Sequence, residues 1–307
     1  MPDFCVWNRC NNKCTMCSNP ADFQRKDVSE KYSFENIVER TQRNADSWRK
    51  SRENINLTGG EPTIHPRFLE LCYWFRKNFP YNRLVLATNG RMFSYSWFAK
   101  NFLQINNIVI ETAILGPTSK LHDAITRVNG SFEQTLKGIS NILKYRGRAQ
   151  ETELRVILIK QNYKLLGKIL SLIFNKFSSV DRVTIIFPEP EGECGQNYEK
   201  VGITYAQVKE KTTSTIKKWS GKFKDLRLYH FPLCTINPKL WKYAWITQRR
   251  DEVDYLPICN NCSYKRYCCG IHKDYLKIIG GGEFKPPKTN LKFQIKKNPY
   301  HPIIGII

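Results

Sequence analysis

Short β-rich runs alternate with amphipathic stretches of helical length from about residue 4 to residue 187, and this alternation constrains the fold more than any other feature. Strand, helix and strand in succession are typical of a parallel sheet covered by helices. The run Arg83-Leu84-Val85-Leu86-Ala87-Thr88 is apolar on both faces, as a strand buried between helices must be. We therefore predict an α/β protein with about six βα units.

The predicted elements can be bounded by residue number. Strands are expected at 4–8, 54–58, 83–88, 107–113, 153–160 and 182–187. Helices are expected at 33–50, 65–77, 94–102, 131–145 and 163–174. The helix at 131 begins with Ser131-Phe132-Glu133-Gln134, which matches a capping box in which Ser131 accepts from the amide of Gln134.

The pattern changes at Pro188-Glu189-Pro190-Glu191-Gly192, which breaks regular structure. A Lys-rich helix at 205–219 and a strand at 226–230 follow, and then a Cys-rich region. We expect a core at residues 1–220, a Cys-rich extension at 221–285 and a basic tail at 286–307 without regular structure.

Composition limits the functional classes. No run of about 18 apolar residues and no secretory signal is present, so we expect a soluble cytoplasmic protein with no membrane partner. Lys and Arg outnumber Asp and Glu by 49 to 27, for a net charge of +22. The basic residues are spread along the chain, so a general bias is favoured, and a surface for nucleic acid stays open.

The 11 cysteines fall mainly into two groups, and the first is Cys10-Asn-Asn-Lys-Cys14-Thr-Met-Cys17. Three thiols within eight residues, directly after a predicted strand, indicate a loop. Gaps of three and two residues let one loop bind three irons of a [4Fe-4S] cubane and leave the fourth iron open. Zinc would need a fourth ligand, for which Cys5 is the nearby candidate.

This C-x3-C-x2-C loop resembles the signature of the radical S-adenosylmethionine (SAM) superfamily. The resemblance implies a partial (β/α)6 TIM-like barrel and SAM bound at the open iron. It also implies reductive cleavage of SAM to a 5′-deoxyadenosyl radical that abstracts hydrogen from a substrate. Met16 stands where the family often has an aromatic residue near the adenine, and its thioether can also cover a ring.

Leu57-Thr58-Gly59-Gly60-Glu61-Pro62 is similar to the family's Gly-Gly-Glu-Pro motif after the second strand. The resemblance implies that Gly59, Gly60, Glu61 and Pro62 meet the amino group of SAM, and glycine permits a close approach. It also makes Glu111 a candidate for the ribose hydroxyls and Arg155 for the carboxylate. Thr88 and Asn89 end the third strand and are further candidates, because ligands gather at the carboxyl ends of barrel strands.

His122 to Phe132 resembles a segment of peptide- and cofactor-maturing members, which implies a substrate-facing role over the barrel mouth. Turn and capping chemistry before the helix at Ser131 is the alternative.

The second group, Cys259-x2-Cys262-x5-Cys268, with Cys234 upstream, resembles the twitch or SPASM-type extension. The resemblance implies an auxiliary [4Fe-4S] cluster. The four expected ligands are Cys234, Cys259, Cys262 and Cys268. A zinc site is the alternative, because a C-x2-C pair is equally typical of zinc.

The leading functional hypothesis is a radical SAM maturase that modifies a peptide or protein and takes electrons from a reducing donor. One alternative is a tRNA-modifying enzyme, which would use the positive charge to bind phosphates. A non-catalytic Fe-S scaffold or electron-transfer protein is the other.

Overall fold

The computed structural model describes residues 3–20, 22–24 and 30–307. Its centre is one parallel sheet of eight strands in sequential order, with β1 and β8 as the edge strands. The predicted α/β class is therefore confirmed, and the sheet runs on through two further strands beyond the six βα units. The strands are β1 (Asp3–Trp7), β2 (Ile55–Gly59), β3 (Leu84–Thr88), β4 (Ile108–Ala113), β5 (Gln150–Ile157), β6 (Arg182–Ile186), β7 (Leu226–Tyr229) and β8 (Ala244–Trp245).

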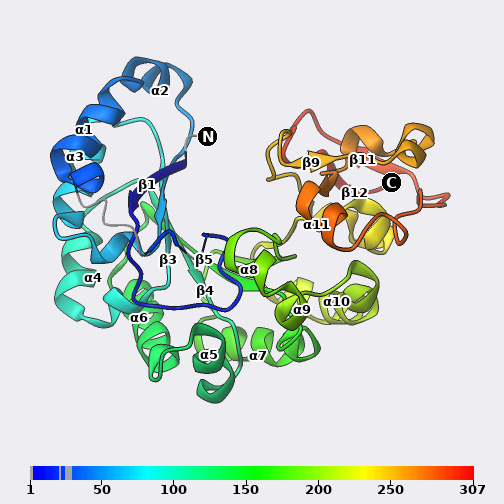
Figure 1. Cartoon of the computed structure of the whole chain (residues 1–307), viewed down its shortest axis with the longest axis horizontal. Coiled ribbons are helices and arrows are strands. Elements are labelled where there is room, and N and C mark those ends of the chain that lie inside the picture. Colours follow the sequence, from blue (N-terminus) through cyan, green and yellow to red (C-terminus); the bar gives the residue numbers. More distant parts are fainter. Residues whose placement is uncertain (1–2, 21, 25–29) are drawn as a thin grey trace.

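Helices cover the outer side of the curved sheet (Figure 1). α8 lies between this core and the C-terminal elements (Figure 1). The helices are α1 (Phe34–Gln42), α2 (Ala45–Ser51), α3 (Phe68–Asn78), α4 (Ser96–Phe102), α5 (Ser119–Thr126), α6 (Ser131–Tyr145), α7 (Leu166–Lys176), α8 (Gly192–Gln196), α9 (Tyr198–Val201), α10 (Tyr205–Trp219) and α11 (Lys273–Ile278). Within the described part of the chain, no helix has the length and apolar character needed to span a bilayer.

β4 and β5 place apolar side chains on the outer face, under the helices, and charged side chains on the inner face. Ile108 and Ile110 of β4 and Leu154 and Val156 of β5 belong to the apolar clusters beneath the helices. Glu111 follows Ile110 and points to the opposite face, and it is paired in register with Glu153, which precedes Leu154. Because side chains alternate along a strand, the sequence that buries Ile and Leu outward turns charged side chains inward.

The C-terminal part contains a short antiparallel pair, β9 (Val253–Asp254) with β10 (Ile271–His272), and a hairpin of β11 (Phe293–Ile295) with β12 (Ile303–Ile306). The expectation that residues 286–307 lack regular structure is therefore wrong. Phe293 stacks on the buried Trp241 with ring centroids 4.6 Å apart, and Ile303 is buried. These apolar contacts stabilise the hairpin despite the many lysines in the tail.

Two local predictions also need correction. The helix expected at 33–50 is two helices, because Asn44 has φ −117° and ψ 5° and interrupts the α-helical backbone. Ser131 does not form a capping box, since Gly130 is the N-cap and Asp123 accepts from the amides of Gly130 and Phe132. The aspartate supplies the acceptor expected from Ser131.

Helix α6 lies against the turn that follows β3. A Cβ atom on Gly138 would be 2.1 Å from the carbonyl oxygen of Gly90, a residue with φ +79°. Glycine at position 138 therefore brings α6 into direct contact with a turn at the carboxyl end of the sheet.

We predict that Gly138→Ala lowers the free energy of unfolding by about 1–3 kcal/mol, although alanine improves helix propensity by about 1 kcal/mol. Gly167→Ala in α7 is the matched control, because the nearest atom to its added Cβ is 4.0 Å away. The control should leave stability unchanged or raise it. Anaerobic urea unfolding measures both, and equal stabilities would contradict the close contact.

Candidate active site at the carboxyl ends of the strands

The loop that carries Cys10, Cys14 and Cys17 follows β1 directly and is held from two sides. The amides of Lys13 and Thr15 donate to the carbonyls of Thr126 and Ile125 at 2.9 and 3.0 Å. On the other side, the amide of Cys194 donates to the carbonyl of Cys17 at 2.9 Å. Segments more than a hundred residues away in sequence therefore fix the loop.

The three thiols are partly buried and lie close enough to influence one another. Burial raises the pKa of Cys10 to about 12, and the charges of Glu61 and Cys17 add to this effect. Burial also raises the pKa of Cys14 and Cys17, and Cys14 is further raised by the other two thiols. Crowded, buried thiolates need a cation to compensate their charge, so this donor set fits a metal centre.

The spacing of the thiols is wider than one metal ion requires. Among the described residues, Glu191, His272 and Asp274 form the group whose ligand atoms all lie within 4.8 Å, and no three cysteines meet that limit. Sulfurs around one tetrahedral zinc lie about 3.8 Å apart. Thiolates of a cubane bind different irons and need not converge on one ion, so the wider spacing disfavours a single zinc ion and leaves a [4Fe-4S] cluster as the metal centre that three thiols of one loop can bind. Cys5, the candidate for a fourth zinc ligand, donates a hydrogen bond from its thiol to the carbonyl of Trp7.

Gly59 and Gly60 allow the end of β2 to lie against the end of β1. A Cβ atom would be 2.1 Å from the Trp7 carbonyl oxygen at Gly59 and 2.3 Å from the Arg9 carbonyl oxygen at Gly60. From the sequence, we expected these glycines to allow the close approach of a cofactor. The structure adds a constraint within the chain itself, because any side chain here would displace the strand that leads into the cysteine loop.

Glu61 is buried, and its carboxylate accepts hydrogen bonds within the protein. The donors are the amide and hydroxyl of Thr63, the hydroxyl of Thr88 at 2.6 Å and the amide of Asn89 at 2.6 Å. Burial raises the pKa of Glu61 despite these donors. The side chain therefore joins the loops after β2 and β3, and Pro62 starts the single turn that follows.

Thr88 and Asn89 lie where the sequence predicted, at the end of β3, but their polar atoms are also used internally. The side-chain Nδ2 atom of Asn89 donates to Asn11 Oδ1 at 2.6 Å, and Asn89 Oδ1 accepts from the backbone amide of Arg91. Arg91 in turn reaches the cysteine loop and was missed from sequence. Its position two residues after Asn89 was the available signal.

Glu111 and Arg155 meet, as their positions on neighbouring strands imply, and form an ion pair. Arg155 also binds Glu153 at 2.8 Å, and Glu153 binds Arg182 at 2.9 Å. Burial alone would raise the pKa of Glu153. The positive charges of Arg155 and Arg182, with Arg155 the stronger, outweigh burial and lower this pKa. Burial raises the pKa of Glu111 to about 7, because Arg155 opposes this only in part and Glu153 adds to it.

The segment from His122 to Phe132 forms the end of α5 and the start of α6. Asp123 accepts from the Ser131 hydroxyl at 2.8 Å as well as from two backbone amides. The carbonyls of Ile125 and Thr126 hold the cysteine loop. His122 is 2% exposed, and burial lowers its pKa to about 4. These contacts are structural, and they place the segment beside the loop.

The structure also brings together Cys234, Cys259, Cys262 and Cys268, which line one largely apolar cavity. A hydrogen bond from Cys269, aided by backbone amides such as that of Leu233, lowers the pKa of Cys268 to about 7. Cys269 does not line the cavity. Cys268 is therefore better placed than Cys269 to act as a thiolate ligand.

Comparison with known proteins identifies the core. The family model described as "Radical SAM superfamily" matches residues 4–173, which include the cysteine loop and the Gly59-Gly60-Glu61-Pro62 turn. The chain belongs to the radical SAM superfamily. Members of this superfamily are enzymes, and the family implies a [4Fe-4S] cluster and SAM as cofactors.

Relatives of this radical SAM protein include GTP 3′,8-cyclase of Petrotoga mobilis, 26% identical over 139 residues, which are 45% of this chain and 41% of the cyclase. Mycofactocin maturase MftC of Mycobacterium tuberculosis is 25% identical over 138 residues, 45% of this chain and 34% of the maturase. The matches thus span less than half of each relative. Streptococcus suis SuiB bound to S-adenosylmethionine has a similar fold, with a TM-score of 0.54 at 15% identity over 74% of this chain and 50% of SuiB.

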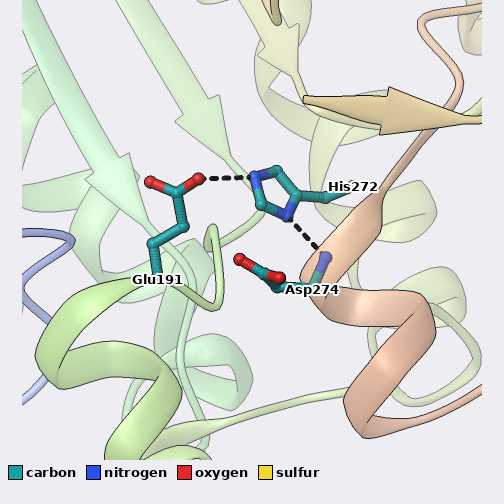
Figure 2. A group of neighbouring side chains, drawn as sticks. All are labelled: Glu191, His272 and Asp274. Carbon is teal, nitrogen blue, oxygen red and sulfur yellow. Dashed lines mark hydrogen bonds and ion pairs between the residues drawn. The ribbon is translucent and has the colours of Figure 1, made fainter. Parts of the chain in front are cut away.

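Beside the radical SAM core lies a group that the sequence did not predict, Glu191, His272 and Asp274 (Figure 2). The His272 Nδ1 atom accepts from the Asp274 amide at 3.2 Å, so the ring proton lies on Nε2, which donates to Glu191 at 3.1 Å. Both ring nitrogens are occupied, and neither lone pair is free for a metal ion. The His272–Glu191 contact joins the core to the C-terminal part.

Glu111 gives the radical SAM protein a measurable pH dependence. Its folded pKa of about 7 lies above the usual 4.5, so the folded state holds a proton that the unfolded state releases. Stability contributed by this proton is present below pH 4.5 and is lost as pH rises to about 7. We predict that Glu111→Gln removes this component, worth up to about 3 kcal/mol.

Anaerobic urea unfolding of wild type and variant from pH 4.5 to 8 measures the difference, which should shift in favour of the variant as pH rises. Glu70→Gln is the control, because hydrogen bonding to Arg67 lowers the pKa of Glu70, so its own pH dependence falls below pH 4.5 and its difference from wild type should stay nearly constant over this range. A pH-independent difference for Glu111→Gln would contradict the prediction.

Proposed function

We propose that this protein cleaves SAM reductively and abstracts a hydrogen atom from a peptide or protein substrate. The observation that carries the radical chemistry is the grouping of Cys10, Cys14 and Cys17, three partly buried thiols on one loop at the carboxyl ends of the strands, which do not all converge within the 4.8 Å that a single ion would need. A cluster held there and reduced by a donor would supply the one electron that splits SAM into methionine and a 5′-deoxyadenosyl radical able to remove a hydrogen atom.

The residues of this chain have the following proposed roles. The backbone of the Gly59–Pro62 turn binds the SAM amino group, because the Glu61 carboxylate is already used by Thr63, Thr88 and Asn89. In the described chain the carbonyl of Gly60 accepts no other hydrogen bond, so it is available for this contact.

Met16 packs on the apolar group of Leu115, Ile125 and Ile159, which supports a role beside the adenine. Arg155 binds the carboxylate of SAM and Glu111 binds the ribose hydroxyls. Both side chains would then have to break their mutual ion pair when SAM binds. Thr88 and Asn89 support the cofactor through Glu61 and the cysteine loop.

We also propose that the cavity of Cys234, Cys259, Cys262 and Cys268 holds an auxiliary [4Fe-4S] cluster. In the described chain no three of these sulfurs converge within 4.8 Å, a spacing wider than one zinc ion needs. The hydrogen bond from Cys269, which lowers the pKa of Cys268, supports ligation by the Cys268 thiolate. The extension that begins near residue 221 would then be an auxiliary-cluster unit that shares the sheet of the core through β7 and β8.

A peptide or protein is the favoured substrate class because two relatives point to it. The name of MftC calls it a maturase, and SuiB has been crystallised with its precursor peptide SuiA. The cyclase among the relatives acts on GTP, as its name says, so the core alone does not specify the substrate.

Iron and sulfide counting after anaerobic reconstitution tests the clusters. Wild type should bind about eight irons, and both the Cys10/Cys14/Cys17→Ala variant and the Cys259/Cys262→Ala variant about four. Only the first variant should lose every trace of 5′-deoxyadenosine formation under dithionite. Cys72→Ala, a fully buried cysteine of α3, is the control and should keep eight. Four irons with bound zinc in wild type would refute the auxiliary cluster.

Deuterium transfer tests the substrate class. An extract of the source cells grown in heavy water is divided into protein and RNA fractions, and each is added to the reduced enzyme with SAM. Deuterium should enter 5′-deoxyadenosine from the protein and peptide fraction. Transfer from the RNA fraction alone would overturn the peptide proposal in favour of nucleic-acid modification.

A further inference from the structure

Arg91, the first residue after the Asn89-Gly90 turn, binds the cysteine loop. Its Nη1 atom donates to the carbonyl of Asn11 and to Asn12 Oδ1, the latter at 2.8 Å. Its Nε atom donates to Gln134 Oε1 of α6 at 2.6 Å. The guanidinium thus ties the two residues between Cys10 and Lys13 to a helix of the core.

The charge of Arg91 is not neutralised by a carboxylate. Its three side-chain hydrogen bonds all go to neutral oxygens, and in the part of the chain that the structure describes it forms no ion pair. The arginines inside the barrel behave differently. Arg155, Arg182 and Arg227 each bind a carboxylate within 3 Å. A full positive charge therefore remains beside the loop.

An unpaired cation at this position acts on whatever the three thiolates bind. A cubane with three thiolate ligands carries net negative charge, and one-electron reduction makes that charge more negative. A fixed positive charge in a partly buried site stabilises the more negative state, because the effective dielectric there is lower than in water. The side chains to which Arg91 donates hydrogen bonds are amides, which carry no charge.

We propose that Arg91 is a positioning residue that orders the turn between Cys10 and Cys14 and, through its unpaired charge, raises the reduction potential of the cluster held there. The inference rests on the proposed function, because it needs a cluster on Cys10, Cys14 and Cys17. It adds an element that makes electron entry from a low-potential one-electron donor easier.

Two substitutions separate the charge from the hydrogen bonds. Gln134→Glu leaves Arg91 and its bonds to the loop in place but puts a carboxylate on Nε, which neutralises the charge. Arg91→Lys keeps the charge but loses the planar fork that reaches two acceptors. Arg127→Gln is the matched control, because it removes one exposed positive charge from the turn between α5 and α6 without touching the loop.

The measurement is a potentiometric titration of the full-length reconstituted protein, followed by EPR. The cluster on the first cysteine group is identified by the change of its signal when SAM is added. For Gln134→Glu we expect the equilibrium constant for reduction to fall about tenfold, which lowers the midpoint potential by about 59 mV. The midpoint potentials of Arg91→Lys and Arg127→Gln should stay much closer to that of wild type.

A second readout needs no cluster. Lys13 is exposed within the loop, so endoproteinase Lys-C can cut after it in the apo protein. Cleavage there should be several-fold faster in Arg91→Gln than in Arg127→Gln, because only the first variant releases the loop. If Gln134→Glu fails to bind iron, the midpoint potentials of Arg91→Gln and Arg91→Lys are compared. Only Arg91→Gln, which lacks the positive charge, should have a midpoint potential below that of wild type.

The possible failures are distinguishable. A wild type that binds no cluster at the first cysteine group would refute the proposed function. A fully loaded Gln134→Glu variant with the wild-type potential, or equal potentials in Arg91→Gln and Arg91→Lys, would overturn the charge effect. Equal cleavage after Lys13 in Arg91→Gln and Arg127→Gln would overturn the positioning role.

Discussion

The buried carboxylate of Glu61 is the interaction on which the site depends. A carboxylate removed from water must be hydrogen-bonded, or its burial costs several kcal/mol (about 1–3 kcal/mol or more for each unmet bond). Its donors come from the loops after β2 and β3, so both loops must be in place together. Through Asn89 and Asn11 the same network extends into the cysteine loop. The active-site end of the sheet therefore forms as one unit.

Close backbone contacts complete this unit and explain why glycines occur where they do. Gly60 lies against the Arg9 carbonyl, and Gly138 lies against the Gly90 carbonyl. At both places two elements approach more closely than any side chain would permit. The cysteine loop is thus supported by β2 beneath it, by the turn after β3 beside it and by α5 and α8 on its flanks.

Periodic and motif-based features were predictable from sequence, and long-range contacts were not. The alternation of apolar runs predicted β1 to β6, because a strand buried beneath helices must be apolar on its outer face. The grouping of Cys10, Cys14 and Cys17 follows from spacing alone. Sequence could not reveal that Asp123, eight residues before Ser131, would accept the hydrogen bonds from the amides at the start of α6. Nor could it reveal that His272 would meet Glu191, since that contact joins elements about 80 residues apart.

The parallel sheet is open, with β1 and β8 at its edges. In a closed ring every strand has two hydrogen-bonded neighbours, whereas an edge strand has one. Among the described strands β1, which leads directly into the cysteine loop, therefore pairs with β2 alone. The backbone contacts from the end of α5 and from α8 thus supply lateral support to the loop that a second neighbouring strand would give in a closed ring.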